Sequence, residues 1–216
     1  MQQKNPALDT LEDIRQIMER SSRFISLSGL SGVAAGICAL TGAWFAHRVI
    51  SGAELILTGD NGSAAARLLS DQLLNIAMVV LCAAIILAFW FTYLKSKKSH
   101  IPVWGTAAKR LVVNLGIPLL AGGVFLLHMT AQGYFKLIAP GCLLWYGIAL
   151  VNAGKYTLGE VRYLGYVQIV LGLTSCWFPE QGLYFWAMGF GVMHIIYGAW
   201  MWWKYDKKSN NGEASS

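Results

Sequence analysis

The sequence predicts an all-α membrane protein with six transmembrane helices arranged as three helical hairpins. Of its 216 residues, 56% are hydrophobic and 13% are charged, whereas an ordinary soluble chain has roughly 25% charged residues. Apolar runs of about 20 residues, the length that crosses the hydrocarbon core of a bilayer, recur along the chain. The six runs cover residues 24–46, 73–94, 111–129, 134–151, 161–178 and 183–203.

The segment before the first run is predicted to hold a short amphipathic helix on the cytoplasmic side. Residues 10–13 (TLED) fit the capping-box pattern that starts a helix. Leu11, Ile14 and Met18 then recur at three- and four-residue steps. Such a helix either anchors at the membrane surface or docks a partner. The chain therefore divides into the N-terminal helix at 1–23, the membrane domain at 24–204 and a disordered cytoplasmic tail at 205–216.

The first span begins with a ladder of small residues. Ser28, Gly32 and Gly36 are four residues apart, so they share one face of a helix. Small residues at this spacing let two helix backbones approach closely in lipid. The ladder predicts a helix-packing seam, filled by another helix of the same chain, by a second copy or by a protein partner.

Three further features concern the connections and bends of the spans. Residues 51–71 form the longest outer connection, and its turn-like GDNG at 59–62 favours a loop or a short re-entrant or interfacial hairpin. Pro118 and Pro140 fall inside the third and fourth runs and are predicted to kink them. Glu160, at the start of the fifth run, is expected to pair with Lys155 or Tyr156 across the preceding turn.

The second half of the chain carries a weak internal repeat. Leu115-Gly116 and Leu164-Gly165 open the third and fifth runs, and Tyr146-Gly147 and Tyr197-Gly198 close the fourth and sixth. Hairpins repeated in this way keep the same orientation in the membrane, unlike the inverted repeats of many transporters. Either a true duplication or the economy of short-looped hairpins explains the pattern.

The distribution of Lys and Arg predicts the orientation, because cytoplasmic loops retain positive charge. With the N-terminus inside, only Arg48, Arg67 and Lys136 of the 17 basic residues fall on the outer side. Both termini should therefore be cytoplasmic. The net charge of +6 is explained by this topology, and no nucleic-acid partner is expected.

Polar residues within apolar runs are the first place to look for function, because hydrocarbon penalises them. Asn114, Gln168 and His194 are the candidate residues lining the helix bundle. They would either line a pathway or donate and accept hydrogen bonds between helices.

No catalytic or cofactor motif accompanies these polar residues. The sequence lacks a GxSxG elbow and a phosphate-binding loop, so we expect no enzymatic activity. We also expect no cofactor or metal, because the cysteines lack the spacing of zinc or haem sites. The four cysteines are Cys38, Cys82, Cys142 and Cys176.

The segment ERSSRFISLSGLSGVAAG at 19–36 resembles the N-terminal region of uncharacterised small bacterial multi-span membrane proteins. The layout of three hairpins is similar to that of six-span bacterial inner-membrane proteins of the HdeD-like group. The resemblance implies a bacterial cytoplasmic (inner) membrane and implies no activity. We expect a non-enzymatic structural, regulatory or partner-binding component in contact with the lipid bilayer. The alternative is a transporter or channel for a small molecule or ion.

Overall fold

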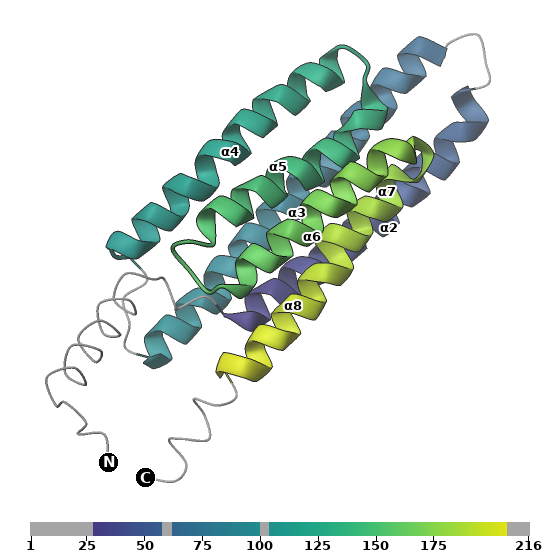
Figure 1. Cartoon of the computed structure of the whole chain (residues 1–216). Coiled ribbons are helices and arrows are strands. Elements are labelled where there is room, and N and C mark those ends of the chain that lie inside the picture. The colour runs from purple at the N-terminus through teal and green to yellow at the C-terminus, as the bar shows by residue number, and fades with distance from the viewer. Residues whose placement is uncertain (1–27, 58–61, 100–103, 207–216) are drawn as a thin grey trace, which may run out of the picture.

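A computed structural model describes residues 28–57, 62–99 and 104–206, which form helices joined by short turns (Figure 1). The predicted amphipathic helix, and all of the predicted tail beyond residue 206, lie outside these ranges. The first five long helices are α2 (Gly29–Leu57), α3 (Gly62–Ser99), α4 (Thr106–Ala131), α5 (Ile138–Ala153) and α6 (Glu160–Trp177). The 3-10 turns η1 (Phe135–Leu137) and η2 (Pro179–Gln181) precede α5 and α7.

The chain closes with one continuous helix of changing type, which we name the last helix. It begins as α7 (Gly182–Trp186) and continues through a π-helical segment, η3 (Ala187–Met193). It then returns to α-helix in α8 (His194–Met201) and ends in a second π-helical segment, η4 (Trp202–Asp206).

Five helical stretches of the described chain are long and apolar enough to cross a membrane, as expected of an all-α membrane protein. They are Gly29–Ala53, Leu68–Lys98, Thr106–Ala131, Phe135–Ala153 and Pro179–Tyr205. Helix α6, which corresponds to the predicted fifth run, is not among them. Glu160, Arg162 and Gln168 lower its mean hydropathy. The sixth crossing therefore stays a prediction.

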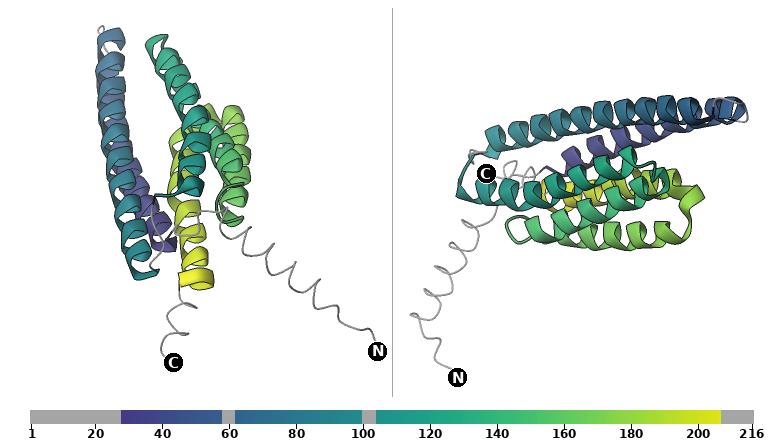
Figure 2. Two further views of the ribbon diagram at one scale, coloured as in Figure 1. Left: turned by 90° about the vertical axis from the view of Figure 1, so that its left-hand side faces the viewer. Right: turned by 90° about the horizontal axis from the view of Figure 1, so that it is seen from above.

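The long helices lie side by side in an elongated bundle (Figure 2). Helix α2 packs against α3 and against the last helix, while α5 packs against α4 and α6. Contact between α6 and the last helix is sparse, so α6 is paired with α5 rather than with its predicted hairpin partner. The start of α2 and the end of the last helix lie at the same end of the bundle (Figure 1).

The predicted loop or re-entrant hairpin over residues 51–71 is wrong. Helix α2 continues to Leu57 and α3 already begins at Gly62. Good helix formers such as Ala64 and Leu68 lie within the predicted connection, and α3 already includes them. At 1.5 Å per residue, the 38 residues of α3 extend about 57 Å. The α2–α3 pair therefore reaches beyond its neighbours (Figure 1).

The predicted kink at Pro140 is also wrong. Helix α5 begins only at Ile138, so Pro140 lies in its first turn, where the missing N–H leaves no intrahelical hydrogen bond unmade. Pro118 lies inside α4, which continues through it to Ala131.

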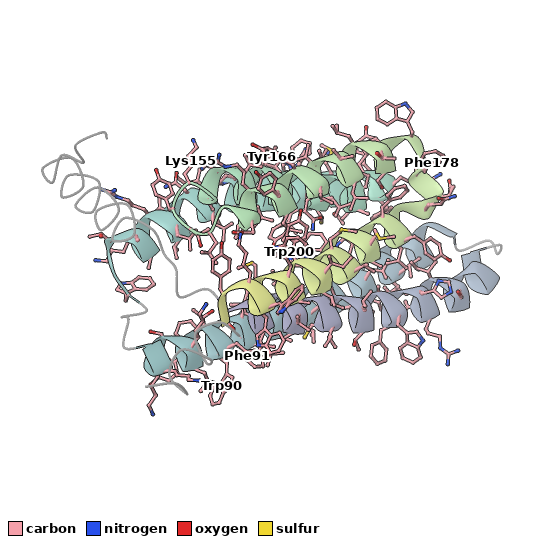
Figure 3. All side chains as sticks on the ribbon, turned by 60° about the horizontal axis from the view of Figure 1, so that its bottom comes forward. Trp90, Phe91, Lys155, Tyr166, Phe178 and Trp200 are labelled. Atoms are coloured by element: carbon pink, nitrogen blue, oxygen red, sulfur yellow. The ribbon has the colours of Figure 1, made fainter. Side chains whose placement is uncertain are left out.

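Apolar side chains cover the outside of the bundle. Trp90, for example, points outward from α3 (Figure 3). No residue in the most apolar stretch of α3 is buried. The buried apolar cluster instead lies between α5 and α6, around Leu150, Val161 and Leu164. A bundle whose outer surface is this apolar is suited to hydrocarbon rather than water.

Candidate functional site

The predicted small-residue seam lies between α2 and the last helix of the same chain. A Cβ atom on Gly32 would lie 3.1 Å from Gly198 Cα and 3.3 Å from the carbonyl oxygen of His194. A Cβ atom on Gly36 would lie 2.7 Å from the carbonyl oxygen of Gly191. The two backbones are thus in contact at both positions, and side chains larger than hydrogen would push them apart.

The seam continues to the first residues of α2. A Cβ atom on Gly29 would lie 2.5 Å from the carbonyl oxygen of Gly198. Ser28, the first residue of the predicted ladder, is buried, and its carbonyl oxygen accepts a hydrogen bond of 2.5 Å from Ser31 Oγ. The Ser31 hydroxyl therefore bonds within its own segment of chain and not across the seam.

A second glycine contact joins α5 and α6. A Cβ atom on Gly147 would lie 2.8 Å from the carbonyl oxygen of Gly165, and one on Gly165 would lie 2.9 Å from that of Gly147. Both glycines mark the internal repeat in the sequence, but the repeat gave no reason to pair them. The partner of a small-residue face depends on the tertiary arrangement, which spacing alone does not specify.

Two of the three predicted bundle-lining residues meet at one backbone carbonyl. The oxygen of Gly189, in η3, lies 2.8 Å from Gln168 Nε2 and 3.0 Å from His194 Nδ1. His194 Nε2 lies 2.8 Å from Tyr146 Oη. Because Nδ1 faces a carbonyl and must donate, Nε2 of the neutral ring accepts and the Tyr146 hydroxyl donates. Tyr146, Gln168, Gly189 and His194 form what we name the polar cluster.

The polar cluster is tightly enclosed. Gln168 is fully buried and His194 is 7% exposed. The ring of Phe190 stacks over His194, with centroids 6.0 Å apart, and lies 5.0 Å from the ring of Tyr146. The cluster thus joins α5, α6 and the last helix, and the Phe190 ring covers it.

Glycine at position 189 allows a close approach of side chains. A Cβ atom there would lie 2.4 Å from Leu143 Cδ2 and 2.5 Å from Gln168 Oε1, so both side chains would have to shift. The hydrogen that glycine carries in that direction faces this oxygen, which has no conventional hydrogen-bond partner in the described part of the chain. A Cα–H···O contact is therefore what remains for Oε1. The side-chain amide of Gln168 meets Gly189 at both its carbonyl and its Cα.

The third predicted lining residue lies at a different helix interface. Asn152 Nδ2 donates to the carbonyl oxygen of Asn114 at 2.9 Å and also lies 3.3 Å from Asn114 Oδ1. Asn114 Nδ2 donates to the carbonyl oxygen of Arg110 at 2.8 Å. These bonds fasten α4 to α5, so Asn114 does not join Gln168 and His194.

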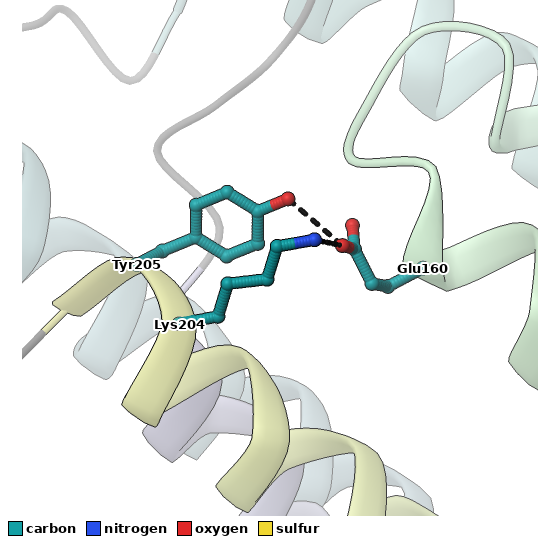
Figure 4. A network of polar contacts seen from close by, with 3 residues as sticks. All are labelled: Glu160, Lys204 and Tyr205. Carbon is teal, nitrogen blue, oxygen red and sulfur yellow. Dashed lines mark hydrogen bonds and ion pairs between the residues drawn. The ribbon is translucent and has the colours of Figure 1, made fainter.

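Glu160 joins the start of α6 to the end of the last helix (Figure 4). Its Oε1 atom accepts hydrogen bonds from Lys204 Nζ at 2.5 Å and from Tyr205 Oη at 2.8 Å. The predicted pairing with Lys155 or Tyr156 is therefore wrong, because the bundle brings the distant end of the last helix closer. Partial burial raises the pKa of Glu160, but the hydrogen bonds from Lys204 and Tyr205 and the lysine charge outweigh it. The pKa of Glu160 is therefore lower than that of an ordinary glutamate.

A second ion pair lies at the opposite end of the bundle. Lys136, in η1, contacts Glu180, in η2, at 2.5 Å, and both side chains are largely exposed. An exposed pair of this kind contributes little to stability. It nevertheless shows which turns are neighbours at that end.

Two residues of these sites escaped the sequence analysis as site residues. Tyr146 stood out only as a marker of the repeat, and Asn152 lies at the edge of its apolar run, where polar residues are ordinary. Within the described residues, no three His, Cys, Asp or Glu side chains gather as a metal site would require.

Comparison of the chain with protein-family models, curated proteins and solved structures finds no match.

Proposed function

We propose that the protein is a non-enzymatic integral component of a bacterial cytoplasmic membrane, with a structural, regulatory or partner-binding role. Six crossings with both termini in the cytoplasm fit its charge distribution and the position of α6 beside α5. The resemblance at residues 19–36 supports the bacterial assignment.

The observation that carries this proposal is that the intramembrane polar residues form hydrogen bonds with one another's helices. Gln168 and His194 both bind the Gly189 carbonyl, while Asn114 binds Asn152 at a separate interface. A transport pathway needs polar groups that face a permeating species. Groups that instead satisfy one another across helices hold a bundle together.

The seam restricts where a partner or a second copy would bind the first span. Its small-residue face already contacts the last helix. The exposed stripe of Leu30, Ile37 and Trp44 on α2 is the face that remains, with exposed fractions of 41%, 55% and 55%. A partner at the first span would therefore meet large apolar side chains rather than the glycines.

A flux and stability comparison tests the proposal. The purified protein is reconstituted in liposomes that contain pH- or potassium-sensitive dyes, and in nanodiscs for thermal unfolding. We expect flux equal to that of empty liposomes. We also expect Gln168→Leu to lower the melting temperature and Gln181→Leu, at an exposed turn position, to leave it unchanged. A protein-dependent flux that Gln168→Leu abolishes would favour the transporter alternative and contradict the proposal.

The proposed topology has its own test. A reporter domain that becomes fluorescent only in the cytoplasm is fused after Ser216, and a second fusion is made after Ala131, at the end of α4. We expect fluorescence from the first fusion alone. A fluorescent fusion after Ala131, or a dark one after Ser216, would contradict the assigned orientation.

A further inference from the structure

The π-helical segment η3 interrupts the last helix at the polar cluster. Hydrogen bonds in a π-helix join residues five apart instead of four, so the segment accommodates an extra residue. One residue of α-helix turns the chain by about 100°. The extra residue therefore decides which side chains on the far side of η3 face each neighbouring helix.

Three contacts after η3 require one particular register. His194 reaches Tyr146 on α5, Gly198 fits against the backbone of α2, and Lys204 reaches Glu160 on α6. A turn of about 100° would move all three away together. It would also bring a residue with a side chain to the place of Gly198, where only hydrogen fits.

The part before η3 is fixed independently. A Cβ atom on Gly182 would lie 3.2 Å from Ala139 Cβ, at the start of α5. The ring of Phe185 stacks on Phe178, with centroids 6.2 Å apart, and the ring of Tyr184 lies 6.3 Å from that of His47. Each half of the last helix is thus held by contacts of its own with α2 and α5.

We propose that η3 is a register device, which takes up the one residue by which the two halves of the last helix are out of α-helical phase. The Gly189 carbonyl, held by Gln168 and His194, fixes the segment in place. The device allows the polar cluster, the glycine seam and the Glu160 contacts to form in one helix. It goes beyond the proposed function, because it concerns how the bundle is assembled whatever its role.

Two single-residue deletions in the full-length chain distinguish this device from an ordinary helix. Met188 lies in η3 and Ile196 in α8, and their exposed fractions are similar, 43% and 50%. Deletion of Met188 removes the extra residue and leaves both halves in register as continuous α-helix. Deletion of Ile196 turns everything after it by about 100°. Met188→Ala and Ile196→Ala control for loss of the side chain alone.

The register is read by cross-linking. Glu160→Cys and Lys204→Cys are introduced after the four native cysteines are replaced, and a short bifunctional thiol reagent is added in nanodiscs. We expect the Met188 deletion to keep at least half of the parent cross-linking yield, and the Ile196 deletion to lose tenfold or more. Equal yields from the two deletions would overturn the proposal. So would failure of the Met188 deletion to accumulate as folded protein in the membrane.

Discussion

A single methyl group added at Gly198 should force α2 and the last helix apart. The new Cβ atom would lie 2.5 Å from Val33 N, 2.7 Å from the carbonyl oxygen of Gly29 and 2.9 Å from the carbonyl carbon of Gly32. All three are backbone atoms, so no rotation of a side chain relieves the clash. Ordinary contact begins at 3.4 Å, and the helices would have to separate by about 0.9 Å at the closest atom.

The magnitude follows from two opposing effects. Overpacking of this kind costs about 1–3 kcal/mol, and the upper value applies because only whole helices can move. Alanine gains roughly 1 kcal/mol over glycine in a helix interior. Gly198→Ala should therefore lower the free energy of unfolding by about 2 kcal/mol.

Gly123 in α4 supplies the matched control, because a Cβ atom there would have nothing within 4 Å. Gly123→Ala should raise the free energy of unfolding by up to about 1 kcal/mol. The assay is equilibrium unfolding in mixed micelles, with tryptophan fluorescence as the signal. A Gly198→Ala variant at least as stable as Gly123→Ala would refute the packing argument.

Two further predictions concern the polar contacts. Tyr146→Phe removes the donor to His194 Nε2 and should lower the free energy of unfolding by about 0.6–1.7 kcal/mol in the same assay. The control, Tyr166→Phe at an exposed position, should leave the free energy of unfolding unchanged. Equal losses from the two variants would contradict the assigned bond. Because the pKa of Glu160 is lowered in the folded protein, the stability that its bonds contribute is complete above its ordinary pKa of 4.5 and is lost as the pH falls through the lowered value. The difference in melting temperature between the wild type and Glu160→Gln should therefore be constant at neutral pH and shrink in acid, whereas a difference that grows in acid would reverse the sign of the argument.

Hydropathy located the helices because a span must be apolar over the thickness of the bilayer. It located their ends less well, since a helix can continue past its apolar part. Residues 47–57 and 62–72 do so, which is why α2 and α3 extend further into their connection than predicted. Hydropathy also says little about pairing, because lipid-facing and helix-facing side chains are equally apolar. The pairing of α6 with α5 was missed for that reason.

The polar cluster was partly predictable for a similar reason. Gln168 and His194 stand out as polar residues within apolar runs, but their shared acceptor is a backbone carbonyl, which no side-chain pattern reveals. Tyrosine is common at membrane boundaries, so Tyr146 gave no distinct signal. The π-helical segment has no sequence signature beyond its two glycines, Gly189 and Gly191.

An experimental structure in lipid nanodiscs, at a resolution that places side-chain amides, would test most directly whether the intramembrane polar residues join helices or line a pathway. We predict that Gln168 and His194 both contact the Gly189 carbonyl and that the backbones at Gly32 and Gly198 touch. No continuous polar cavity should then reach the polar cluster. A water-filled cavity that opens Gln168 and His194 to one face of the membrane would contradict the proposed non-transport role.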